Sequence, residues 1–159
     1  MTATPPSAEL LGATTAEPCI SYFTFFLRGL EDGADPQAAV GTAPKRWTVL
    51  AGPGGALFRC ATTDFHPQVR LESWSGEPAA PQGSWDTLET VEFELFRHGK
   101  VQLNEWDGFP SGEPVELGGP GVYRLRAASL GRDAAKERHA AGEMFFHGTE
   151  EWLIQLWPR

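Results

Sequence analysis

The last ten residues of the chain, Glu150–Arg159, read EEWLIQLWPR and decide which kind of fold to expect. Trp152, Ile154 and Leu156 occupy every second position, which is the spacing of side chains on one face of a β-strand. Two further apolar residues suggest that the opposite face is partly covered as well: Leu153 and Trp157. We interpret this segment as a core strand that closes a sheet, not as a chemical site.

The same alternation occurs in the segment Gly121–Asp133, which reads GVYRLRAASLGRD. Tyr123 and Leu125 match the inward set of the closing strand, while Arg124 and Arg126 are expected to face outward. Other short segments have the apolar and aromatic content of strands: Cys19–Gly29, Arg46–Leu50, Ala56–Ala61 and Gln68–Trp74. The 31 Gly and Pro residues, scattered between these runs, punctuate a turn-rich chain. We therefore predict an all-β fold, an antiparallel β-sandwich of about eight strands, with a β-barrel as the alternative.

The stretch TVEFELFRHGKVQLNEW, residues 90–106, is predicted to form a β-hairpin. Val91, Phe93 and Leu95 share one face, and Val101 and Leu103 share a face on the following run. A one-residue slip would invert every side chain, so the two faces match only if Leu95 pairs with Leu103. The prediction is thus a three-residue loop, His98 to Lys100, with Gly99 or a neighbour at positive φ.

The chain is expected to form one β-sandwich domain, residues 18–159, after a disordered N-terminal tail, residues 1–17. The start of the sequence has no basic segment followed by an apolar run, so no signal peptide is evident. No stretch is long and apolar enough to predict a membrane span. We therefore expect a cytoplasmic protein, in which Cys19 and Cys60 are reduced and buried.

Charge limits the classes of partner. The formal net charge is −8, which argues against direct binding of nucleic acid, since that needs clustered Lys and Arg. The acidic residues concentrate between Asp86 and Glu116, where eight acids face two bases. Such a segment can dock a basic protein, or it can simply keep an edge hairpin soluble.

On the outward face of the predicted hairpin, two aromatic side chains stand among acids, a pattern typical of binding hot spots. The expected partner-binding residues are Glu92, Glu94, Phe96, Glu105, Trp106 and Asp107. The aromatic residues would anchor a partner, and the acidic residues would steer it. The leading hypothesis is a non-enzymatic protein-interaction module.

Two alternatives come from other classes. Trp74, Trp85 and Trp106 each stand near acids and could form the platform of a carbohydrate-binding module. An enzyme of unrecognised type would need polar groups converging in a cleft, and Asp64 with His66 is the best starting pair. The histidines and cysteines lack metal-ligand spacing, so no metal site, catalytic residue or cofactor is predicted.

Two stretches carry a resemblance, GPGVYRLRAASLGRD at Gly119–Asp133 and EEWLIQLWP at Glu150–Pro158. They are similar to a pattern in small uncharacterised proteins of high-GC Gram-positive bacteria. More distantly, ISYFTFFLRG and the order of strands resemble the competence protein J family, which inhibits a DNA-entry nuclease. That resemblance implies an immunity- or inhibitor-type role against a basic partner such as a nuclease, and it carries over no individual site residue.

Overall fold

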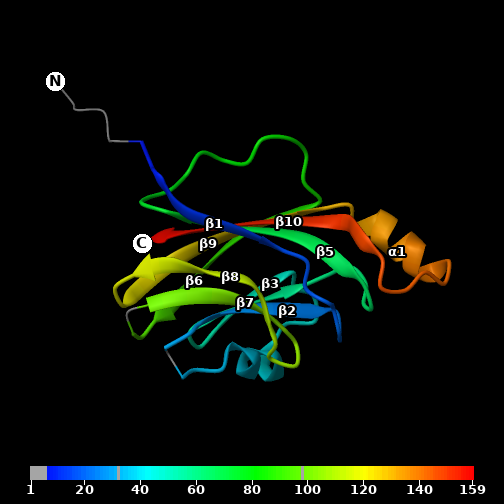
Figure 1. Ribbon diagram of the computed structural model, residues 1–159, viewed down its shortest axis with the longest axis horizontal. Coiled ribbons are helices and arrows are strands. Elements are labelled where there is room, and N and C mark those ends of the chain that lie inside the picture. The colour runs from blue at the N-terminus through cyan, green and yellow to red at the C-terminus, as the bar shows by residue number, and fades with distance from the viewer. Residues whose placement is uncertain (1–6, 32, 98) are drawn as a thin grey trace.

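A computed structural model of the chain describes residues 7–31, 33–97 and 99–159. Two five-stranded sheets pack face to face (Figure 1). The β10 sheet contains, in spatial order, β1 (Leu10–Ala16), β5 (His66–Trp74), β10 (His147–Pro158), β9 (Gly121–Leu130) and β6 (Thr87–Leu95). The β2 sheet contains, in spatial order, β3 (Val49–Gly52), β4 (Gly55–Arg59), β2 (Thr24–Gly29), β7 (Gly99–Glu105) and β8 (Pro110–Gly118). The predicted sandwich is therefore confirmed over the barrel, and the described residues form ten strands where about eight were expected.

The closing strand β10 lies in the middle of its sheet. It pairs antiparallel with β9, where Leu156 lies opposite Leu125, and parallel with β5, where Ile154 lies opposite Leu71. The β10 sheet is thus mixed, whereas the prediction was wholly antiparallel. The other pairings in both sheets are antiparallel.

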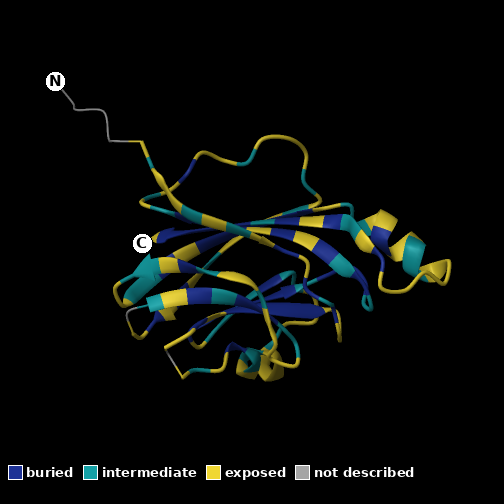
Figure 2. Ribbon diagram, in the orientation of Figure 1, coloured by how far each residue is buried: buried dark blue, intermediate teal, exposed yellow. Residues whose placement is uncertain are grey.

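The core lies between the sheets, and the closing strand supplies its largest side chain. Trp152 of β10 contacts Phe25 and Phe58 of the opposite sheet edge-on, at ring-centroid distances of 5.6 and 5.8 Å. Ile154 and Leu156 are fully buried beside it. Figure 2 shows the resulting alternation of buried and exposed residues along the strands. The inward set read from the sequence is confirmed.

The predicted hairpin is wrong. Strand β6 pairs with β9 at one edge of the β10 sheet, whereas β7 pairs with β2 and β8 in the opposite sheet. Leu95 and Leu103 are both buried, as expected, but they enter the core from facing sheets. Of the predicted loop, Gly99 and Lys100 belong to β7, and His98 lies outside the described residues.

The predicted tail is also wrong in part. Leu10–Ala16 form β1, which pairs antiparallel with β5. This strand escaped prediction because its side chains are mostly small or exposed, so it has no apolar alternation to read. Strand β8 was missed for a similar reason, since Pro and Gly interrupt it, and it lies at the edge where such residues are tolerated.

Two short helices flank the sheets. The 3₁₀ helix η1 (Pro36–Thr42) lies in the expected loop between β2 and β3. Helix α1 (Arg132–Ala140) follows β9 at one end of the sandwich (Figure 1). Gly131 joins β9 to α1 at a φ of 80°, and a Cβ there would lie 1.9 Å from the carbonyl oxygen of Thr149. No helix in the described part of the chain is long and apolar enough to cross a membrane.

Candidate functional site

The six residues predicted to bind a partner do not share one face. Glu92 and Glu94 lie on β6, the edge strand of the β10 sheet, and Phe96 follows that strand. The other three, Glu105, Trp106 and Asp107, lie at the far end of β7, in the opposite sheet. Because β6 and β7 belong to different sheets and form no hairpin, the predicted set divides into two groups of three residues.

The first group is partly neutralised. Glu92 accepts a hydrogen bond from Arg124 at 3.4 Å through Oε1 and another from Arg159 at 3.0 Å through Oε2. Its charge is therefore offset by two cations on the same exposed surface. Glu94 and Phe96 are exposed beside it.

The second group lies against a turn that the sequence did not single out. Ser21 pairs with Thr24, and the two residues between them, Tyr22 and Phe23, have φ angles of 54° and 65°. The Tyr22 ring lies 6.3 Å from the Trp106 ring, between centroids, and Tyr22 is 76% exposed. The far end of β7 thus carries two adjoining aromatic side chains near solvent.

Carboxylates lie close to this turn, since Asp64 lines the same hollow as Tyr22 and Phe23, and Glu105 and Asp107 flank Trp106 along the chain. Glu105 Oε2 accepts a hydrogen bond from the backbone N–H of Cys19 at 2.8 Å. Burial, followed by the charges of Glu105, Asp64 and Asp107, raises the pKa of the Cys19 thiol. We call the surface formed by Tyr22, Phe23, Asp64, Trp106 and Asp107 the aromatic patch.

A cleft of about 490 Å³ lies next to this surface, and Phe23 forms part of its wall. We call it the basic cleft, because four of its lining residues are cations and only one is an acid. Its wall consists of Phe23, Arg46, Trp47, Thr48, Arg59, Cys60, Ala61, Glu89, Arg132 and Lys136. The cleft lies where the edge strands β6 and β3 meet, and Thr48 donates a hydrogen bond to Glu89 across that edge at 2.7 Å.

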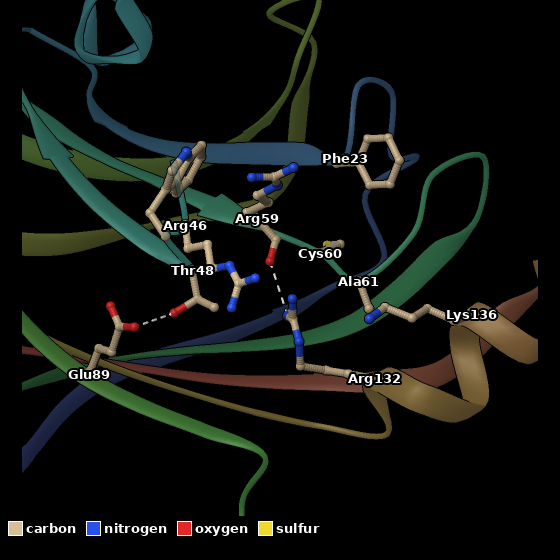
Figure 3. Close-up of a pocket in the computed structure, with 10 residues that line it drawn as sticks. Phe23, Arg46, Thr48, Arg59, Cys60, Ala61, Glu89, Arg132 and Lys136 are labelled. Carbon is tan, nitrogen blue, oxygen red and sulfur yellow. Dashed lines mark hydrogen bonds between the residues drawn. The ribbon is translucent and has the colours of Figure 1, made fainter. Parts of the chain in front are cut away.

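Arg132 extends from the start of α1 into the cleft toward the backbone of Arg59, as Figure 3 shows. Its Nη1 donates to the carbonyl oxygen of Arg59 at 3.0 Å and lies 4.0 Å from Oε1 of Glu150. The fully buried Glu150 also accepts hydrogen bonds from the backbone N–H of Ala61 and from Nε1 of Trp152. The hydrogen bond to Arg59 and the ion pair with Glu150 thus hold the Arg132 side chain in place at the cleft.

The thiol at the cleft is not a reactive one. Burial, and next the carboxylate of Glu150, raise the pKa of the Cys60 thiol well above its ordinary value. A thiol held in its protonated form is a poor nucleophile. Cys19 and Cys60 are both free, as predicted, and Cys60 is buried while Cys19 is half-buried.

The residues of the alternative hypotheses lie apart. Trp74 ends β5 and donates to Glu72, Trp85 donates to the carbonyl oxygen of Gln82, and Trp106 follows β7 in the other sheet. His66 stacks on His147 at a ring-centroid distance of 4.2 Å. Among the described residues, no three or more His, Cys, Asp or Glu side chains are arranged to hold a metal ion.

Comparison with known proteins finds likeness in structure rather than in sequence. No protein-family model matches the chain, and no curated protein matches it by sequence. The solved structure of ComJ from Bacillus subtilis, an inhibitor of the DNA-degrading activity of NucA, is similar with a TM-score of 0.58 and 12% identity. That match covers 97% of this chain and 100% of ComJ.

A second solved structure, described as crocagin biosynthetic gene J, is similar with a TM-score of 0.59 and 16% identity. This match covers 97% of this chain and 99% of the other protein's chain. At these identities the two matches establish a shared fold across nearly the whole chain.

Proposed function

We propose that the chain is a non-enzymatic protein-binding module of inhibitor type, and that it docks a partner with a basic surface through the aromatic patch. The proposal depends chiefly on one observation, the Tyr22–Phe23 turn. Left-handed backbone costs an ordinary residue roughly 1–2 kcal/mol, and this turn places two large aromatic residues in that conformation. Such strain gathers at functional sites and ligand clamps.

The exposure of the turn adds to the argument. Tyr22 is 76% exposed, Phe23 is 40% exposed and Phe109, in the turn that follows Trp106, is 67% exposed. Tyrosine and tryptophan near the centre of an interface supply much of its binding energy. A strained turn that presents aromatic rings to solvent, instead of burying them, is suited to a protein partner.

The surrounding charge favours a basic partner. Asp64 lines the same hollow as Tyr22 and Phe23, and Glu105 and Asp107 flank Trp106 along the chain. Carboxylates around an aromatic centre steer association with a positively charged surface and select against acidic partners. Glu105, Trp106 and Asp107 therefore remain in the proposed site, whereas Glu92, Glu94 and Phe96 form a separate surface.

The fold is consistent with this role. ComJ, which shares the architecture across its whole length, is an inhibitor of a DNA-degrading nuclease. A nuclease is the kind of partner we propose for this chain, because a DNA-binding surface is rich in Lys and Arg. A cytoplasmic location belongs to the same proposal.

The test compares two double variants with the wild type. Each purified protein is immobilised, and partners from the native cell are quantified by isotope-labelled mass spectrometry. Tyr22→Ala with Trp106→Ala should lose a specific partner that Glu92→Lys with Glu94→Lys retains. If the second variant alone loses it, the aromatic patch is not the docking surface; if no variant changes the captured set, the proposed function is wrong.

The captured partner then permits a functional assay. If it is a nuclease, its degradation of DNA is followed while the wild-type protein is added at increasing concentration. We expect stoichiometric inhibition by the wild type and by the Glu92→Lys, Glu94→Lys variant, and weaker inhibition by the Tyr22→Ala, Trp106→Ala variant. Full DNA degradation at saturating wild-type protein would contradict the inhibitory role.

A further inference from the structure

We infer that the basic cleft is a binding site for a small organic phosphate, such as a nucleotide. This inference does not depend on the proposed docking of a protein. It concerns a neighbouring cleft, a different sign of charge and a different class of ligand.

Charge is the first reason. The wall of the cleft carries four cations and one carboxylate, a sum of +3, in a chain whose formal net charge is −8. Counting the buried Glu150 beneath Arg132 still leaves +2. Like charges gathered around one opening repel each other, and a bound anion removes that cost. An excess of two to three positive charges matches a phosphate ester or a diphosphate.

The direction of the side chains is the second reason. Arg46 comes from the loop before β3, whereas Arg132 and Lys136 come from successive turns of α1. Figure 3 shows the ends of these three side chains turned toward the middle of the cleft. Two guanidinium forks and one ammonium group provide the planar, bidentate contacts and the point charge by which proteins hold phosphate.

These cations are available to a ligand. Within the described ranges, no carboxylate forms an ion pair with Arg46, Arg59 or Lys136. The Arg59 guanidinium lies about 6 Å from the ring centroids of Phe23 and Trp47. Arg132 is already anchored through Nη1, which fixes its guanidinium in the cleft beside the other cations.

The volume and the lining residues of the basic cleft indicate what is joined to the phosphate group of the ligand. A volume of about 490 Å³ is in the range of small-molecule sites and exceeds what one phosphate group fills. Trp47 and Phe23 provide aromatic surface at the wall, together with the planar Arg59 guanidinium that lies over both rings, and a planar ring can pack against this cluster. A phosphate joined to an aromatic ring system meets both requirements.

The test is calorimetric titration of the full chain, in phosphate-free buffer at low salt, with inorganic pyrophosphate and with adenosine diphosphate as probes. Saturable binding of either probe is expected. Arg46→Ser and Lys136→Ser should each weaken it roughly tenfold or more, since each removes a charge-assisted contact. The matched control is Lys45→Ser, which removes the same charge next to Arg46 but lies outside the cleft wall.

Tighter binding of the nucleotide than of pyrophosphate would show that the aromatic wall contributes, and equal binding would show that the phosphates carry the affinity. Near-ultraviolet circular dichroism checks that each variant keeps the native packing. The inference is overturned if neither probe binds saturably at millimolar concentration. It is also overturned if Lys45→Ser weakens binding as much as Arg46→Ser does, because the effect would then be general attraction to a positive surface.

Discussion

Arg132 donates a hydrogen bond from Nη1 to the carbonyl oxygen of Arg59 at 3.0 Å, and this contact joins the start of α1 to the end of β4. Beneath it, Glu150 lies 4.0 Å from the same guanidinium. The contact links α1, which follows β9 of the β10 sheet, to β4 of the β2 sheet. It also fixes the position of Arg132, which lines the basic cleft, so the shape of that cleft depends on it.

The buried carboxylate of Glu150 should be essential for stability. Glu150→Ala leaves the N–H groups of Ala61 and Trp152, and part of the Arg132 charge, without their acceptor. We expect a loss of roughly 2–5 kcal/mol in the free energy of unfolding, measured in urea. The exposed neighbour provides the control: Glu151→Ala should change the free energy by less than about 0.5 kcal/mol. Equal effects would show that the buried network is not stabilising.

Gly131 should tolerate no side chain. Gly131→Ala combines a left-handed φ of 80° with a Cβ only 1.9 Å from the Thr149 carbonyl oxygen. Gly142→Ala is the matched control, because Gly142 has a φ of 89° and no atom within 4 Å of the added Cβ. The control should lose about 1–2 kcal/mol from its backbone conformation. Thermal unfolding should show a much larger loss, or no folded protein, for Gly131→Ala; similar melting temperatures would contradict this account of the turn.

Acid should destabilise the fold partly through Glu72. Burial opposes the charge of this carboxylate, but hydrogen bonds from Arg70, Gln155 and Trp74 overcome that cost and lower its pKa. Because the pKa of Glu72 is lower in the folded than in the unfolded chain, the stabilisation is fully present at pH values above the unfolded-state pKa. The stabilisation is lost as the pH falls through the folded-state pKa of Glu72.

The measurement for Glu72 is urea unfolding at a series of acidic pH values. The wild type should lose stability steadily over that window, and Glu72→Gln should start less stable at neutral pH and show a flatter decline. Glu151→Gln, an exposed substitution in the neighbouring strand β10, should follow the wild-type curve. Parallel curves for the wild type and Glu72→Gln would rule out this carboxylate as a source of the pH dependence.

Period-two patterning correctly predicted which side chains point inward but not which strands pair. Leu95 and Leu103 satisfy the same pattern whether their strands are neighbours in one sheet or face each other across the core. Only three residues separate β6 from β7, and that short connection suggested a hairpin. The chain instead crosses between sheets, so an acidic segment continuous in sequence is not one continuous surface.

The two segments that carry the resemblance, Gly119–Asp133 and Glu150–Pro158, contact each other through side chains, which the sequence alone could not show. Arg126 donates two hydrogen bonds to Oε1 of Gln155, at 3.0 and 2.8 Å, and lies over the ring of Trp157. It faces outward, as predicted, yet it is buried because the loop at Pro78 and Ala79 covers it and accepts its remaining hydrogen bonds. These residues hold β9 to β10.

The candidate sites were only partly predictable. Trp106 and its acidic neighbours were predicted from the sequence. Tyr22 was missed because it lies in a segment patterned like a strand. Its left-handed turn also contains no Gly or Asn, the residues that usually indicate such a turn. The basic cleft combines residues from five distant segments, and no local signal in an acidic chain indicates it. Convergence of this kind becomes visible only once the topology is known.

The most direct test of the proposed function is the dissociation constant of the captured partner for Tyr22→Ala, Trp106→Ala and Phe96→Ala, each measured singly. Phe96 is the matched control, since it is an exposed aromatic residue of the separate β6 surface. We expect Tyr22→Ala and Trp106→Ala each to cost about 2 kcal/mol or more, roughly thirtyfold in affinity, with Phe96→Ala close to the wild type. Unchanged affinity in the Tyr22 and Trp106 variants, with a loss in Phe96→Ala, would contradict docking through the aromatic patch.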